Sequence, residues 1–271
     1  MGPTRAFVWL SLVGLVLPVS GHGAETRVAV AANFAAPMQA LASAFAHDTG
    51  HRAQVVTGAT GRLYAQIVNG APFDVLLAAD DRTPRKLVSD KLAVGDSEFT
   101  YALGTLVLWS ANPSFVDAGG AVLRRGQFAH LAIANPRVAP YGVAATQALE
   151  ALGLLTALRP KIVEGEDVGQ TATFVATGNA ELGFVAFSQV SGPGHLPAGS
   201  HWIVPAKLYA PIRQDAVLLS RGSSNPAARA LCDYLRGQSA KALIRAYGYG
   251  LDDVGATDPP AAEGGLPPSP P

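Results

Sequence analysis

The sequence is poor in cysteine, in charge and in aromatic residues. Cys232 is the only cysteine, so no disulfide can form within the chain. Charged residues make up 15% of the chain, and 20 basic residues balance 20 acidic ones. Proteins that bind a nucleic-acid backbone normally carry an excess of basic residues on one face, so the composition indicates no nucleic-acid partner. An anion bound by this chain must be held mainly by hydrogen-bond donors and helix dipoles.

Several motifs of catalysis and metal binding are also missing from the sequence. The glycine-rich segment 58–61 (GATG) lacks the Lys-Ser or Lys-Thr that completes a nucleotide-binding P-loop. No Gly-x-Ser-x-Gly elbow is present, and the histidines show no spacing typical of a metal site. We therefore expect a non-enzymatic protein without a metal centre or cofactor.

The first residues have the organisation of an export signal. A short basic segment (residues 1–5) precedes an apolar run (6–19) and a stretch of small residues before Glu25. A membrane anchor is the alternative, but the apolar run is shorter than a full span. We predict a signal peptide at residues 1–24, cleaved near residues 22–25, and a mature protein in the periplasm.

The remaining chain alternates between strand-like and helix-like patterns, which is typical of an α/β fold. Its strands are continuously apolar, as expected for mostly parallel sheets that helices cover on both faces. The alternation of strands and helices starts anew after residue 103 and again near 211. Residues 101–110 are predicted to form one long strand. We predict two lobes with a ligand cleft between them, formed by residues 25–103 plus 211–253 and by residues 104–210. The Pro- and Gly-rich segment 254–271 is predicted to be a disordered tail.

Four predicted strand-to-helix junctions share one design. The carboxyl ends of such strands are where α/β proteins bind ligands, and helix N-termini present unpaired N–H groups there. Asn33 and Thr60 are predicted to cap helices and to add side-chain donors. Taken singly, each residue is more often an ordinary cap. The four residues at these junctions are Asn33, Thr60, Tyr141 and Val168.

Several sequence blocks resemble the periplasmic molybdate-binding proteins of ABC transporters. The blocks occur in order along residues 27–251. They read VAVAANF (28–34), GATG (58–61), IVNGAPFDV (67–75), ANP (134–136), APYG (139–142), EDVGQ (166–170) and GFVA (183–186). The resemblance implies the two-lobed periplasmic binding protein fold of type II, with a central oxyanion site.

The resemblance also implies which residues bind the oxyanion. Asn33 and Thr60 would bind it from the first lobe, and Tyr141 and Val168 from the second, mainly through backbone N–H groups. Ala32 would contribute only its backbone. Many members of the family have a ligand-binding tyrosine where this chain has Ala186, so more of the binding would rest on Tyr141 here.

The implied function is high-affinity binding of molybdate, and also of tungstate, by a monomer that delivers it to a membrane ABC permease and its ATPase. A receptor for sulfate or another tetrahedral oxyanion is the first alternative; an enzyme or a sensor on the same fold is the second. Asp167 is expected to face away from the ligand and to interact with a helix end. If it faced the ligand, a protonated oxyanion such as phosphate would be favoured. Arg62 is expected to face solvent, and Gly61 to leave room for the ligand.

Overall fold

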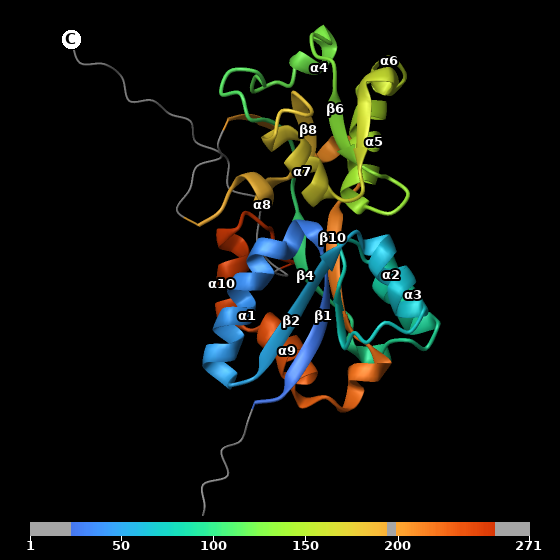
Figure 1. The fold of residues 1–271 in the computed structure, drawn as a ribbon, viewed down its shortest axis with the longest axis vertical. Helices are drawn as coiled ribbons and strands as arrows, with labels where there is room; N and C mark the ends of the chain where they lie inside the picture. Colours follow the sequence, from blue (N-terminus) through green and yellow to red (C-terminus); the bar gives the residue numbers. More distant parts are fainter. Residues whose placement is uncertain (1–22, 194–198, 253–271) are drawn as a thin grey trace, which may run out of the picture.

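The computed structural model describes residues 23–193 and 199–252, which form two lobes placed end to end (Figure 1). Residues 1–22 of the predicted signal peptide and the whole predicted tail, 254–271, lie outside the described residues.

The first lobe is built on a five-stranded sheet with the order β2-β1-β3-β10-β4. The apolar residues of α1, α9 and α10 pack on one face of this sheet, and those of α2 and α3 pack on the other. Its strands are β1 (Glu25–Ala31), β2 (Arg52–Gly58), β3 (Val75–Leu77), β4 (Phe99–Gly104) and β10 (Ile212–Leu218). Its helices are α1 (Ala35–Thr49), α2 (Thr60–Val68), α3 (Arg82–Ser89), α9 (Pro226–Arg236) and α10 (Gln238–Ala246).

The second lobe repeats this plan with the order β7-β6-β8-β5-β9. Its strands are β5 (Leu106–Ser110), β6 (Leu131–Ala134), β7 (Ile162–Gly165), β8 (Leu182–Ala186) and β9 (Ser200–Ile203). Its helices are α4 (Val122–Arg125), α5 (Pro140–Ala151), α6 (Leu155–Leu158), α7 (Val168–Ala176) and α8 (Phe187–Val190). Short 3-10 turns complete the two lobes: η1 (Ala32–Phe34), η2 (Gly95–Ser97), η3 (Arg159–Lys161), η4 (Ala206–Leu208) and η5 (Ser220–Ser224).

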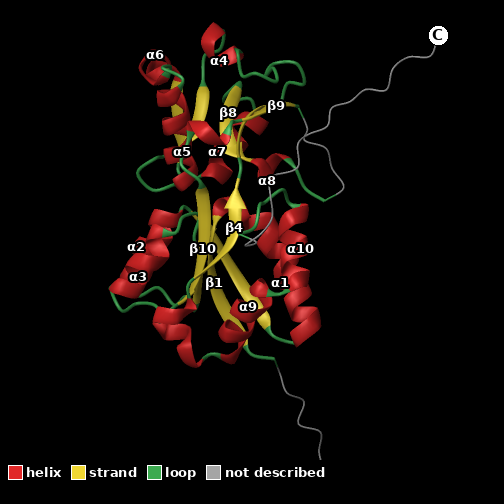
Figure 2. Cartoon of the chain, turned by 180° about the vertical axis from the view of Figure 1, so that it is seen from behind, coloured by secondary structure: helices red, strands yellow, loops and turns green. Residues whose placement is uncertain are grey.

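Both sheets are mixed, although most strands in each run in one direction. In the first sheet β1 pairs in parallel with β2 and β3, and β10 is antiparallel to β3 and β4. In the second sheet β6 pairs in parallel with β7 and β8, and β5 is antiparallel to β8 and β9. Helices flank both sheets, so the predicted α/β fold is confirmed (Figure 2).

The prediction of one long strand over residues 101–110 is wrong. The structure has two strands there, β4 and β5, which belong to different sheets and are separated by Thr105. The chain crosses from one lobe to the other at this point and returns between β9 and β10. Because the core of each lobe buries its part of the crossing segment, the apolar pattern continues without a turn signal.

Local sequence signals place the helix starts that matter for the site. Pro140 opens α5, where its missing N–H costs no helical hydrogen bond. Asp167 caps α7 by accepting the backbone N–H of Gln170 at 2.9 Å. Within residues 23–193 and 199–252 no single helix is long and apolar enough to span a membrane; the pair formed by Pro140–Ala151 and Leu155–Lys161 meets that test only with a 117° bend.

Candidate oxyanion-binding site

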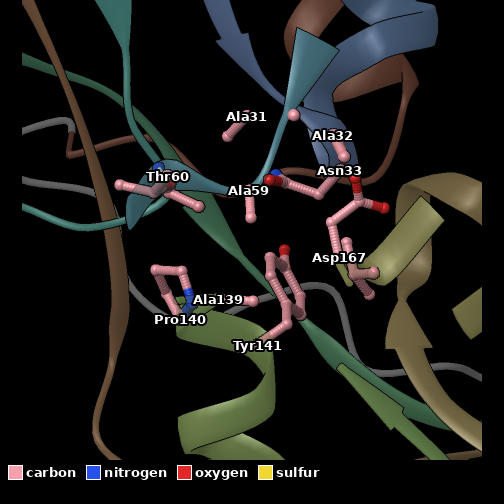
Figure 3. Close-up of a pocket in the computed structure, with 12 residues that line it drawn as sticks. Ala31, Ala32, Asn33, Ala59, Thr60, Ala139, Pro140, Tyr141 and Asp167 are labelled. Atoms are coloured by element: carbon pink, nitrogen blue, oxygen red, sulfur yellow. Dashed lines mark hydrogen bonds between the residues drawn. The ribbon is translucent and has the colours of Figure 1, made fainter. Parts of the chain in front are cut away.

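A small cavity lies where the two lobes meet, at the carboxyl ends of several strands (Figure 3). The cavity volume is about 10 Å³, far below the roughly 300–1,000 Å³ of typical sites for organic ligands. The size therefore fits a small inorganic ion better than a sugar or a nucleotide. The lining residues are Ala31, Ala32, Asn33, Gly58, Ala59, Thr60, Ala79, Ala139, Pro140, Tyr141, Asp167 and Val168.

All five residues predicted from the sequence line this one cavity. Thr60 is the first residue of α2, Tyr141 the second of α5 and Val168 the first of α7, while Ala32 and Asn33 belong to the 3-10 turn before α1. The first N–H groups of a helix have no acceptor within that helix, so three helix starts direct donors at the same space. Their role in binding an anion stays a prediction.

Two buried hydroxyl groups have their protons available for a ligand. Thr60 Oγ1 accepts the backbone N–H of Ala79 at 3.0 Å, and Tyr141 Oη accepts from Nε2 of Gln214 at 3.3 Å. Each oxygen thus serves as an acceptor, and its own proton has no acceptor among the residues that the structure describes. Burial also raises the pKa of the Tyr141 hydroxyl well above its usual range, so this group stays protonated at neutral pH.

Asn33 does not act as the helix cap that its sequence context predicts. The helix α1 begins two residues later, and Asn33 Nδ2 donates instead to Gln214 Oε1 at 2.8 Å and to Tyr249 Oη at 3.0 Å. A side chain inside a 3-10 turn points away from the N–H groups that a cap would accept, which explains the difference.

The amide oxygen of Asn33 is the exception in an otherwise paired region. It is buried and has no hydrogen-bond partner among the described residues. An unpaired buried acceptor costs about 1–3 kcal/mol, so such an atom marks a place where a ligand or a rearranged side chain is needed. Figure 3 shows the Asn33 side chain turned toward the same space as the Tyr141 hydroxyl.

The polar residues behind the cavity wall were not predicted from the sequence. Gln214 is fully buried and contacts Asn33, Tyr101 and Tyr141, while Ser188 and Tyr249 contact the backbone oxygen of Asn33. One signal was available, because Gln214 interrupts the apolar alternation along its strand. The sequence alone did not show what it faces.

Asp167 is the only carboxylate in the lining, and the described lining residues include no lysine, arginine or histidine. Its predicted interaction with a helix end is confirmed by the hydrogen bond to Gln170. The expectation that it faces away from the site is only partly met, because the residue lines the cavity beside Ala32 (Figure 3). The site can therefore attract an anion only through neutral donors.

Two contacts between the lobes, both made by the start of α2, correct two expectations. The Gly61 N–H donates to the Val138 carbonyl at 2.9 Å, so the missing side chain makes room for the other lobe rather than for a ligand. Arg62, expected to face solvent only, is half exposed and forms an ion pair with Glu166 of the second lobe at 2.8 Å. The lobes are thus in contact, and the structure is a closed form.

Comparison with known proteins places the chain in a family. Residues 26–250 match the family of bacterial extracellular solute-binding proteins. The chain is 58% identical over 236 residues to the molybdate-binding protein ModA of Azotobacter vinelandii, covering 87% of this chain and 94% of that one. It is 48% identical to the ModA protein of Rhodobacter capsulatus, covering 88% and 92% of the two chains.

A solved structure gives the same result for the fold. The periplasmic molybdate-binding protein of Azotobacter vinelandii superposes with a TM-score of 0.82 at 44% identity, over 84% of this chain and all of that one. This agreement confirms the two-lobed arrangement and the resemblance noted in the sequence blocks. The chain belongs to the bacterial extracellular solute-binding proteins, and among them it is similar to the molybdate-binding ModA proteins.

Proposed function

We propose that this protein is the periplasmic molybdate-binding component of an ABC transporter, a monomer that delivers its ligand to a membrane permease and its ATPase. The observation that carries the proposal is the small interlobe cavity, into which three helix starts and the hydroxyl groups of Thr60 and Tyr141 direct donors. The similarity to ModA proteins supports the choice of ligand.

A fully ionised tetrahedral oxyanion suits a wall of neutral donors because it accepts hydrogen bonds on every side. Each charge-assisted hydrogen bond contributes about 1.5–3 kcal/mol, and about seven of them, reduced by desolvation and ordering, account for nanomolar binding near −12 kcal/mol. Tungstate has the same charge and shape and is expected to bind as well. No step of this function needs a cofactor or catalysis.

Closure and binding are coupled in this proposal. An anion in the cavity contacts Thr60 of the first lobe and Tyr141 of the second, so it stabilises the form in which both are close. The contacts between Gly61 and Val138 and between Arg62 and Glu166 are available only in that form.

Phosphate is the second candidate, because Asp167 lines the cavity and one specific property of phosphate matches it. A protonated oxyanion carries an O–H group that needs an acceptor, and the second carboxylate oxygen of Asp167 can supply one. Sulfate is fully ionised, as molybdate is, so the carboxylate of Asp167 repels both ions to the same extent.

Calorimetric titration of the mature protein against sodium molybdate, tungstate, sulfate and phosphate at pH 8 tests the proposal. We expect saturable 1:1 binding of molybdate and tungstate with nanomolar dissociation constants, and binding of sulfate and phosphate at least about a thousandfold weaker. Tighter binding of sulfate or phosphate than of molybdate would contradict it.

A further inference from the structure

Gln214 connects cavity residues that come from opposite lobes. It lies in β10, the strand by which the chain returns to the first lobe, and it is fully buried. Its Oε1 accepts from Asn33 Nδ2 at 2.8 Å and from Tyr101 Oη at 3.0 Å, and its Nε2 donates to Tyr141 Oη at 3.3 Å. One amide group therefore joins Asn33 of the first lobe to Tyr141 of the second.

The other crossover strand leaves space for this connection. Gly104 ends β4, and a Cβ atom there would lie 2.3 Å from the Tyr141 hydroxyl oxygen and 2.6 Å from Gln214 Nε2. Both distances are far below van der Waals contact. Any side chain at position 104 would separate the two groups, so the contact depends on a glycine at the hinge.

The direction of the Gln214 amide decides where the Tyr141 proton goes. With Nε2 toward Tyr141, the hydroxyl oxygen accepts and its proton is left for the cavity. With the amide turned over, Oε1 would take that proton. Its NH₂ would then face Nδ2 of Asn33, donor against donor, unless Asn33 turned over as well. The two amides can therefore turn only together.

The turned pair presents a different donor to the ligand. The Asn33 NH₂ would then occupy the place of its oxygen, the atom that is now buried without a partner among the described residues. The Asn33 side-chain oxygen would then accept from Gln214, and also from Tyr249 once that hydroxyl turned its proton from the backbone oxygen of Asn33. The NH₂ of Asn33 would be the group left for the ligand. Each orientation thus supplies one side-chain donor, from Tyr141 or from Asn33.

We propose that Gln214 is a positioning residue of the oxyanion site. The orientation of its amide determines whether Tyr141 or Asn33 directs a side-chain donor at the ligand, and in this way it couples the two lobes in binding. This inference rests on the proposed function. Gln214 acts through these two neighbours and has no contact of its own with the cavity.

The decisive variant is Gln214→Glu, measured by calorimetric titration with sodium molybdate at pH 8 and pH 6. An ionised carboxylate at position 214 can only accept; it would take the Tyr141 proton, hold the Asn33 NH₂ away from the cavity and add a negative charge. The protonated carboxyl has one donor and one acceptor and so imitates the native amide. Burial and the nearby anion raise the pKa of such a carboxyl, so the ionised form, and the loss of affinity, is greatest at high pH.

We expect Gln214→Glu to bind molybdate about a hundredfold more weakly than the wild type at pH 8, and to recover about tenfold of that loss at pH 6. Gln214→Met, which removes both hydrogen-bonding atoms, should lose about tenfold at both pH values. The matched control is Gln147→Glu in α5, where the side-chain oxygen accepts the Ala210 N–H outside the cavity and a carboxylate can do the same.

The other ionisable groups near Gln214 are present in the wild type, which serves as the baseline for pH. Burial raises the pKa of the hydroxyls of Tyr101, Tyr141 and Tyr249, so they stay protonated from pH 6 to pH 8. The nearby carboxylates are those of Asp80, Asp167 and Asp215, of which Asp80 is bound by Thr83 and Asp215 by Thr100.

A merely structural Gln214 would lower thermal stability but leave the pH profile of affinity unchanged. Equal affinities of Gln214→Glu and Gln214→Met at both pH values, or wild-type affinity in either, would overturn the proposal. If these variants do not fold, Gly104→Ala disrupts the contact between Gln214 and Tyr141 by a change in the other crossover strand. Wild-type affinity for molybdate in Gly104→Ala would also overturn the proposal. If the wild type bound sulfate but not molybdate, only the proposed function would be contradicted. The Gln214 variants would then be titrated with sulfate in place of molybdate.

Discussion

Replacing Asn33 by aspartate is expected to abolish molybdate binding at pH 8. The substitution keeps the shape of a side chain that is 2% exposed and lines the cavity, but it places a carboxylate there. Two unit charges 4 Å apart repel by about 4 kcal/mol at an effective dielectric constant of 20, and a dianion doubles this. We expect calorimetric titration to show a loss of more than about a thousandfold in affinity.

The control for Asn33→Asp is the same change at an exposed site. Asn112 accepts from the N–H and hydroxyl of Ser114 through Oδ1, which a carboxylate can also do. Asn112→Asp should therefore bind like the wild type. An Asn33→Asp protein that is folded and binds molybdate with an affinity within tenfold of wild type would exclude Asn33 from the site.

Truncation of Thr60 to alanine should also weaken molybdate binding strongly. It removes the hydroxyl whose proton is available to the ligand, and it leaves the buried Ala79 N–H without its acceptor. The loss of one hydrogen bond to a charged group, about 1.5–3 kcal/mol, corresponds to roughly 10- to 150-fold weaker binding. The same titration measures it, and thermal unfolding should show a lower midpoint as well.

Thr60→Ser separates the two effects because serine keeps the hydroxyl and loses only the methyl group. We expect it to retain affinity within a few fold of the wild type. If Thr60→Ala and Thr60→Ser bind equally well, the hydroxyl has no part in binding and the helix start alone remains as a donor from α2.

The sequence predicted the fold and the cavity residues because both follow from local patterns. Alternating apolar strands and amphipathic helices predict an α/β architecture, and strand-to-helix junctions predict where donors gather. The resemblance to a known family then selected Ala32, Asn33, Thr60, Tyr141 and Val168, which the structure brings together. The prediction of a single strand over residues 101–110 was wrong because it, too, rested on a local pattern. The segment passes from the core of one lobe into the core of the other with a continuous apolar pattern, so its two strands look like one in the sequence.

What the sequence could not show is the direction of side chains and the contacts between distant segments. Asn33 looks like a cap, yet its amide reaches Gln214, which lies 181 residues further along the chain. Arg62 looks like a surface residue, yet it pairs with Glu166, 104 residues away. These partners are set by how the lobes close, and closure leaves no periodic signal in the sequence.

The closed form also explains how a chain without net charge can bind an anion. Hydrogen bonds to charged groups are stronger where water is excluded, and the contacts of Gly61 and Arg62 with the second lobe hold the two lobes together beside Thr60. Neutral donors attract every anion less than lysines would, so shape and donor direction determine which anion binds. Gln214 controls donor direction in this account.

The most direct test of the central claim is an anomalous difference map, recorded at the molybdenum absorption edge, from crystals grown with equimolar molybdate. We predict one strong peak inside the interlobe cavity, with oxyanion oxygens within hydrogen-bond distance of Thr60 Oγ1, of the N–H of Val168, and of Tyr141 or Asn33. A map without a peak in the cavity, or with its only peak elsewhere on the protein, would contradict the account.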